Sequence, residues 1–336
     1  MTTYSFRSSL AACLTFALAA GCGATAYGDA NSNLSVEALR QGGVDVLISV
    51  DWEGDDLVDA PLAAMVQFRK DHPNIPLVQF LNAAYYTKPQ ADTASVTEKI
   101  SSTLLPIDEL GLHLHGWKSL FTSAGVAFQS SPSFTGRPTW DCSYDCGHDV
   151  PISLYTAAEL SRVLSFSVRK LESQGFGRAQ SFRAGGWMAG PTVRAALVKQ
   201  NFLFDHSSVP VSLLAPKMQP LGWPLVGMLN LLWGDTTIES QPRLMAAGSG
   251  QLTEIPDNGA LADWVSVADM KRTIDSAIAT WQADHNSTPV VSIGFHQETA
   301  DQYLSKINAI VDYLDKKEHE GVVVRYVTSD EAGDAL

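Results

Sequence analysis

Two histidines one residue apart are the clearest chemical signal in this chain. They are His113 and His115, within the apolar stretch of residues 111–117. In a strand, side chains two positions apart point to the same face, so both imidazoles would face one site. Neutral imidazoles that face together are common ligands of divalent transition metals. The pair therefore predicts a metal site and, with it, an enzyme.

A second polar pattern lies upstream and also follows an apolar, strand-like run. Asp51 and Glu53 come directly after residues 44–50, which are rich in β-branched side chains. Acidic side chains in this position favour a functional role, but Asp and Glu are also common in the first turn of a helix. Two strand ends that each carry metal-compatible side chains suggest one shared site.

Three further polar side chains stand at or just after predicted strands: Arg183, Asp205 and His296. In parallel α/β folds, sites gather at the carboxyl ends of the strands, so these side chains are candidates for the same site. Two glycines follow Arg183 and allow close backbone approach. The alternative for Arg183 is a surface charge beside a core Trp187.

Strands alternate with helices along the chain. The predicted strands cover residues 44–50, 76–81, 110–115, 181–183, 202–205, 289–296 and 322–326, and the predicted helices cover residues 60–71, 94–105, 157–174, 191–200, 267–283 and 303–317. Residues 118–150 are expected to form a long loop over the site. Residues 210–260 contain six prolines and are expected to be loop-rich with short strands. The alternation predicts an α/β fold with a parallel sheet, open or closed into a barrel, in a single domain.

Composition limits the choice of partners. The chain has 336 residues, of which 45% are apolar, enough for a sizeable core. Lys and Arg total 23 against 36 Asp and Glu, which gives a net charge of −13. A broadly acidic surface argues against nucleic acid or anionic lipid as a main partner.

The beginning of the chain is typical of an export signal. Residues 1–22 hold a polar start with Arg7, a short apolar segment and Cys22. Residues 19–22 resemble a bacterial lipobox, in which Cys22 would carry a lipid anchor; residues 24–26 offer an ordinary cleavage site instead. We therefore expect a periplasmic or cell-envelope lipoprotein, or alternatively a secreted protein. Residues 23–40 would form a tether and residues 41–332 the catalytic domain.

The remaining cysteines agree with export. Cys142 and Cys146 are expected to close a small disulfide loop in an oxidising compartment. The alternative is a metal site that includes His148 and Asp149.

Taken in order, these motifs resemble the five motifs of the polysaccharide deacetylase family, the NodB-homology group, in a divergent form. The corresponding stretches are an acidic motif at residues 49–53, a histidine motif at 113–115, an arginine motif at 183–187, Asp205 with its serines, and residues 295–296. The resemblance implies a distorted (β/α) barrel with a divalent metal held by one carboxylate and two histidines.

The resemblance also implies a role for each candidate residue. The metal ligands would be Glu53, His113 and His115, and the metal would be zinc, with cobalt, nickel or iron also compatible with these ligands. The groups that handle protons would be Asp51 as general base, Arg183 as the residue that orients it, His296 as the acid for the leaving group, and Asp205 as the partner of His296.

Departures from the family pattern leave parts of this prediction open. Trp52 separates Asp51 from Glu53, whereas the family's commoner motif has adjacent aspartates, so these two acids could exchange roles. The commoner histidine pair has three residues between its members. The expected activity is metal-dependent removal of acetyl groups, chiefly N-acetyl, from an extracytoplasmic polysaccharide. A non-catalytic carbohydrate-binding protein and a hydrolase of small amides or cyclic imides are the alternatives.

Overall fold

The fold is an α/β arrangement around one curled sheet. The structure is a computed structural model in which residues 42–334 are described, and these residues belong to one compact unit. Within that range the strands are β1 Val44–Asp51, β2 Leu77–Leu81, β3 Glu109–Leu114, β4 Ser181–Ala184, β5 Phe204–Asp205, β6 Arg243–Ala247, β7 Gly250–Glu254, β8 Val290–His296 and β9 Val324–Tyr326. The helices are α1 Asp59–Asp71, α2 Thr93–Ser101, α3 Lys118–Ser123, α4 Ala157–Glu172, α5 Pro191–Lys199, α6 Val211–Met218, α7 Leu225–Trp233, α8 Val267–Ala283, α9 Ala300–His319 and α10 Ser329–Gly333.

The strand order places the predicted site strands next to one another. Along the sheet the order is β6-β7-β5-β4-β3-β2-β1-β8, and β9 pairs with β1. All pairs are parallel except β6 with β7, which form an antiparallel hairpin at one edge. Asp51 at the end of β1 is level with His296 at the end of β8. His113 is level with Arg183 on the neighbouring strand β4.

The two ends of the sheet are joined by an irregular segment rather than by a strand pair. After β7, the backbone N–H of Asp257 donates to the carbonyl of Ser208, and the N–H groups of Gly259 and Ala262 donate to the carbonyls of Ser292 and Gly294 on β8. The segment therefore crosses from the β5 side of the sheet to β8. The sheet itself stays open, so the predicted distorted barrel is realised as an α/β half-barrel.

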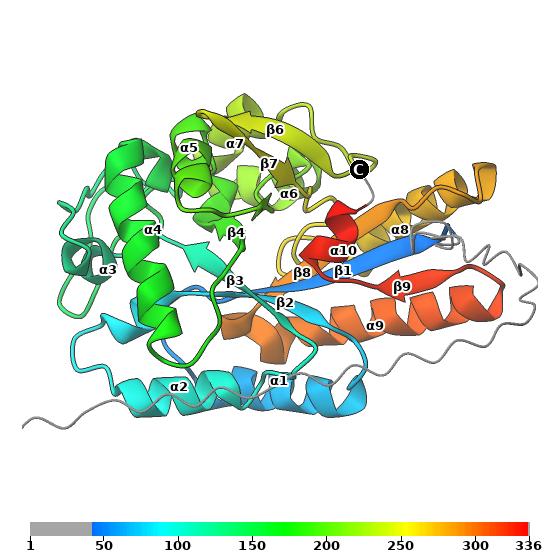
Figure 1. Ribbon diagram of the computed structural model, residues 1–336, viewed down its shortest axis with the longest axis horizontal. Helices are drawn as coiled ribbons and strands as arrows, with labels where there is room; N and C mark the ends of the chain where they lie inside the picture. Colours follow the sequence, from blue (N-terminus) through cyan, green and yellow to red (C-terminus); the bar gives the residue numbers. More distant parts are fainter. Residues whose placement is uncertain (1–41, 335–336) are drawn as a thin grey trace, which may run out of the picture. The chain divides into compact units, whose positions relative to one another are not determined.

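Helices cover the outside of the sheet, as the alternation predicts. Helices α1 and α9 pack side by side, α8 packs against α9, and α4 packs against α5 (Figure 1). The ends of α4 and α8 are fixed by capping boxes, Thr156 with Glu159 and Ser266 with Asp269. No helix among residues 42–334 is long and apolar enough to span a membrane.

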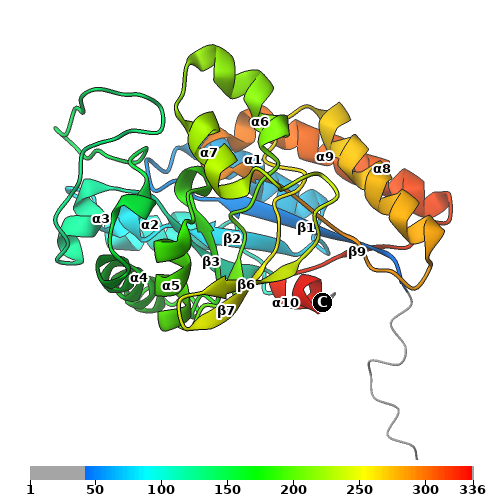
Figure 2. The same cartoon turned by 90° about the horizontal axis from the view of Figure 1, so that it is seen from above.

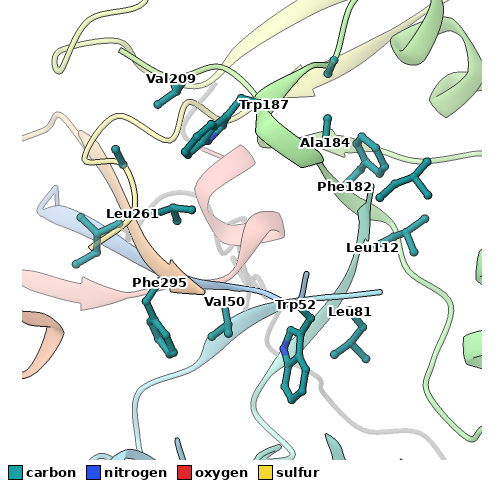
Figure 3. Close-up of a cluster of buried hydrophobic side chains, with 14 of the residues drawn as sticks. Val50, Trp52, Leu81, Leu112, Phe182, Ala184, Trp187, Val209, Leu261 and Phe295 are labelled. Atoms are coloured by element: carbon teal, nitrogen blue, oxygen red, sulfur yellow. The ribbon is translucent and has the colours of Figure 1, made fainter. Parts of the chain in front are cut away.

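The core has an apolar part and a part that contains buried charged side chains. Apolar side chains from β1, β3, β4, β8 and the segments that follow them pack together, including Val50, Leu112, Phe182 and Phe295 (Figure 3). At the same sheet, Asp51, Arg183 and other charged side chains are also buried. Buried charges persist only when they are paired, so these residues form the framework of the candidate site.

The prediction for residues 210–260 is wrong in part. Instead of a loop-rich segment, this region contains helices α6 and α7, which lie together above the strands in the second view (Figure 2), and then the β6–β7 hairpin. Prolines misled the prediction, because Pro210 and Pro224 occupy the N-cap positions of these helices, where no helical N–H is lost. The other predicted strands and helices are confirmed, with ends that differ by a few residues.

Candidate metal centre and its surroundings

Three predicted side chains meet at the carboxyl ends of β1 and β3. Nε2 of His115 lies 2.8 Å from one carboxylate oxygen of Glu53, and Nε2 of His113 lies 3.4 Å from the other. Both ring nitrogens are buried, and beyond Glu53 neither has a hydrogen-bond partner within residues 42–334. Among the described residues, these three side chains form a group whose ligand atoms lie within 4.8 Å of one another. The set of one carboxylate and two imidazoles fits a divalent metal such as zinc.

Backbone carbonyls fix how the two imidazoles face the centre. Nδ1 of His113 lies 2.9 Å from the carbonyl oxygen of Arg183, and Nδ1 of His115 lies 2.5 Å from that of His148. Because a carbonyl only accepts, each Nδ1 carries the proton, and each neutral ring then presents the lone pair of Nε2 to Glu53. Lone pairs and a carboxylate repel one another unless a cation lies among them. The centre therefore takes up either protons or a metal ion.

The pKa shifts of Glu53 and His115 also favour a cation at this centre. Burial raises the pKa of Glu53, but the charge of His115 and hydrogen bonds from both histidines outweigh it and bring that pKa well below its usual value. Burial lowers the pKa of His115, but the charge and the hydrogen bond of Glu53 raise it by more. The pKa of His115 therefore lies above its ordinary value. A carboxylate that is held ionised beside imidazoles is prepared for a divalent ion.

The backbone of Glu53 is held from three sides. Its carbonyl accepts hydrogen bonds from Nδ2 of Asn82 at 3.0 Å and from Nε1 of Trp117 at 2.7 Å. Its N–H donates to a carboxylate oxygen of Glu298 at 3.0 Å. Gly54 follows with a φ of 81°, a conformation that side chains disfavour. The acidic motif is thus a fixed turn at the end of β1 and not the start of a helix.

Asp51 is tied to Arg183 beside this centre. One carboxylate oxygen of Asp51 accepts a hydrogen bond from the guanidinium at 2.9 Å, and the same guanidinium nitrogen donates to Oγ of Ser49 at 2.8 Å. The Arg183 side chain is fully buried and also lies 3.5 Å from Asp257. The structure thus pairs Arg183 with Asp51, and Arg183 is not a surface charge.

His296 also faces Glu53, at the carboxylate oxygen that His113 approaches, and its partner is Asp263. Nε2 of His296 is 3.2 Å from a carboxylate oxygen of Glu53, and Nδ1 is 3.1 Å from a carboxylate oxygen of Asp263. Burial lowers the pKa of His296, but the charge and hydrogen bond of Asp263, with the charges of Glu53 and Asp51, raise it to about 10. In the metal-free protein this imidazole is therefore protonated at neutral pH.

The expected partnership of Asp205 with His296 is corrected. Asp205 is buried at the end of β5, where it accepts a hydrogen bond from Ser207 at 2.5 Å and is level with Glu254 on β7. In the sheet, β5 is separated from β8 by four strands. The segment that crosses the open side of the sheet carries Asp263 to His296 instead.

Asp205 and Glu254 form a buried pair of carboxyl groups. Burial raises the pKa of Asp205 to about 6, and burial together with the charge of Asp205 raises the pKa of Glu254 well above its usual value. One oxygen of each carboxyl group has no other partner. Two acids in such an environment share a proton, and this pair lies apart from the metal centre.

Two carboxylates near the centre are absent from the sequence-based prediction, Asp263 and Glu298. Glu298 holds the backbone of Glu53, accepts a hydrogen bond from the hydroxyl of Tyr85, and has its pKa raised to about 8 by burial and by the charge of Glu53. Glu298 lies two positions after His296, the last residue of β8. Its position just after a strand end could have marked it as a candidate site residue. Asp263 follows no regular strand, and nothing in its local sequence marks it.

A cavity of about 540 Å³ opens over the metal centre. Glu53, His115, His296 and Glu298 line one part of it. Its remaining wall comes from the loop that follows β3, from the turn after β4, from α6 and α7 and the turn between them, from the segment after β7, and from the start of α9. The volume lies within the range of roughly 300–1,000 Å³ that is typical of small-molecule sites.

The predicted disulfide is confirmed, and the alternative metal site at these cysteines is wrong. Cys142 and Cys146 are bonded to each other, so neither thiol is free to hold a metal. The loop between β3 and α4 that contains them is irregular after the short helix α3, as expected. The same loop supplies the carbonyl of His148 that orients His115.

Comparison with known proteins gives structural matches only. No family model and no curated protein sequence matches the chain. A crystal structure described as a polysaccharide deacetylase from Mycobacterium smegmatis is 12% identical, with a TM-score of 0.44, and the alignment covers 86% of this chain and 95% of that one. The Puue allantoinase is 11% identical, with a TM-score of 0.48 and coverages of 87% and 89%.

A third match is a 4-alpha-glucanotransferase from Thermococcus litoralis. It is 10% identical, with a TM-score of 0.47, and the alignment covers 88% of this chain and 41% of that one. The first match carries the name of the family that the sequence motifs resemble. At these identities the likeness concerns the fold alone, so the chemistry of the site rests on its own residues.

Proposed function

We propose that this protein is a metal-dependent hydrolase of acyl amide bonds, a divergent relative of the polysaccharide deacetylases. The observation that carries the proposal is the convergence of Glu53 with the buried Nε2 atoms of His113 and His115, which have no other partner among the described residues. Asp51 and His296 flank this centre at the ends of neighbouring strands. Such a set provides ligands, a base and an acid at the ends of neighbouring strands.

The proposed chemistry divides between the metal and the protein. When bound, a divalent cation supplies Lewis-acid chemistry, which polarises a substrate carbonyl and makes a water molecule more acidic. Asp51 is the proposed base: its carboxylate takes up the proton of the attacking water, and a hydrogen bond from the guanidinium of Arg183 holds it in place.

His296 is the proposed acid. The bond from Nδ1 to Asp263 leaves Nε2 directed toward the centre; burial lowers the pKa of the ring, and the charge and hydrogen bond of Asp263 raise it. Its Nε2 proton would pass to the departing amine, which needs a proton to leave. The assignment of Asp51 as base and Glu53 as ligand is favoured because Glu53, and not Asp51, lies between the two histidines.

The finer parts of the proposal come from the sequence. We propose zinc as the metal, an acetylated glycan outside the cytoplasm as the substrate, and export by residues 1–22 with a lipid anchor on Cys22. Those residues lie outside the described range. The tether at residues 23–40 and the catalytic domain at residues 41–332 likewise stay predictions.

Acyl release by metal-reconstituted protein tests the proposal. We expect the protein to bind one equivalent of Zn²⁺ and to release acid from amide substrates, presented as a panel of acetylated glycans, linear amides and cyclic imides. Stoichiometric metal binding with no release from any of them, together with measurable glycan binding, would favour the carbohydrate-binding alternative. Release from small amides alone would favour the small-substrate alternative.

A further inference from the structure

The wall of the cavity is largely apolar. Beyond the metal centre, the side chains that form most of it are aromatic or aliphatic: Phe134, Trp187, Met218, Trp223, Leu225 and Trp264. Trp223 and Trp264 pack edge to face, with ring centroids 5.5 Å apart. These residues come from four separate segments, so the fold gathers apolar surface at this place.

Three of the polar side chains of the wall already have hydrogen-bond partners, and His148 and Tyr303 are two further polar side chains that line the cavity. Nζ of Lys217 donates to the carbonyl of Asp263 at 2.7 Å. The hydroxyl of Thr299 donates to the carboxylate of Asp263, and the hydroxyl of Thr135 donates to the carboxylate of Asp149. No Arg, Asn or Gln lies among the described residues that line the cavity.

This wall has a consequence for binding. A sugar ring in the cavity would lose water from its hydroxyl groups and find few free partners in return, which costs about 1–3 kcal/mol for each unsatisfied group. A hydrocarbon chain or an aromatic ring has no such cost and gains from leaving water. The space also exceeds what the methyl of an acetyl group would fill.

We propose that the cavity binds the acyl side of the substrate, and that this acyl group is an uncharged hydrocarbon chain or aromatic ring larger than acetyl. This inference rests on the proposed hydrolysis of acyl amide bonds and replaces the acetyl group of the proposed substrate by a larger acyl group: the reaction would be hydrolysis of medium-chain or aromatic acyl amides. The apolar acyl group lies against Trp223, Leu225 and Trp264 while its carbonyl faces the metal centre.

Ligands of increasing chain length test the inference. For the zinc-loaded protein we expect hexanohydroxamate to bind at least about tenfold more tightly than acetohydroxamate, because each buried methylene contributes a factor of about four. For the metal-free protein, hexanamide should quench tryptophan fluorescence at lower concentration than acetamide. The second measurement does not need metal or turnover, so it can succeed even if the proposed function fails.

Variants at the cavity wall locate the effect. Trp223→Ala should remove most of the gain from chain length, and Leu221→Asn, at a half-exposed position on the wall, should weaken it. Leu231→Ala is the matched control, because Leu231 on α7 is 88% exposed and does not line the cavity. Equal affinities for the short and long ligands in the native protein, or an equal loss in the Leu231→Ala variant, would overturn the inference.

Discussion

Gly185 lies directly against the imidazole of His115. A methyl group on Gly185 would come within 2.5 Å of the ring atoms Nδ1 and Cε1, closer than any real contact. The absence of a side chain there lets β4 and the turn after it approach the second histidine. The arginine motif and the histidine motif are thus linked by packing as well as by the hydrogen bond from His113 to the carbonyl of Arg183.

This packing predicts that Gly185→Ala weakens metal binding. The new methyl would displace the His115 ring and lengthen its bond to the carbonyl of His148, so we expect metal affinity to fall about 10- to 100-fold. Competition with a fluorescent chelator measures the affinity. Gly177→Ala is the control, because nothing lies within 4 Å of a methyl group at that position. An unchanged affinity in the Gly185→Ala variant would show that the ring tolerates the contact.

Replacing both His113 and His115 by Ala should abolish metal binding. The two Nε2 atoms that face Glu53 are lost, and Glu53 alone cannot hold a transition metal tightly. Metal content after dialysis, measured by mass spectrometry, gives the result. His319→Ala, which changes an exposed histidine on α9, should leave the content unchanged. Retention of one equivalent of metal in the double variant would refute the assignment of the ligands.

Asp51→Asn and Glu53→Gln should have different effects. The first removes a base but no ligand, so we expect full metal content and an activity reduced by about 100-fold or more. The second removes a ligand, and metal content should fall with activity. Parallel measurement of zinc content and acyl release separates the two roles. The exchanged assignment predicts the reverse: metal lost in Asp51→Asn and kept in Glu53→Gln.

Asp263→Asn should lower the pKa of His296 from about 10 toward its ordinary value of 6.5. Because the folded-state pKa of this histidine is raised, its ion pair stabilises the metal-free protein fully below about pH 6.5, and this stabilisation is lost as the pH rises through about 10. Titration of the ring by NMR measures the change. Asp205→Asn is the comparison, and the pKa of His296 should hardly move there. A larger effect from Asp205 would restore its predicted role.

Glu254→Gln should stabilise the protein at alkaline pH. The pKa values of Asp205 and Glu254 are both raised by folding, so the native pair is most stabilising below about pH 4, and this contribution is lost as the pH rises through about 6. An amide at position 254 can donate to Asp205 without a shared proton. At about pH 8 we expect a gain of about 1–3 kcal/mol in the free energy of unfolding.

Urea unfolding at several pH values measures that gain. It should shrink toward zero near pH 4, at which both carboxyl groups of the native pair hold protons. Glu239→Gln, at an exposed position, serves as the control and should give no pH-dependent difference. A variant that is less stable than the native protein at every pH would indicate that Glu254 is needed as a carboxylate.

Local sequence was sufficient for most of the framework of the site. The spacing of His113 and His115 places both rings on one face of any strand, and the apolar run before Asp51 requires a buried strand that ends there. Because parallel strands end at a common edge, these residues had to lie near one another once the sheet was parallel. The histidine pair, both acids, Arg183 and His296 were therefore predictable as one cluster.

The choice between similar residues depended on the tertiary structure. Asp205 and Asp263 could not be told apart locally as partners of His296; the crossing of the segment after β7 to β8 decided for Asp263. The apolar cavity wall also depended on α6 and α7, whose prolines resembled a loop in the sequence. Strand ends follow from short-range patterns, whereas contacts between segments far apart in the chain follow from packing, which one sequence does not reveal.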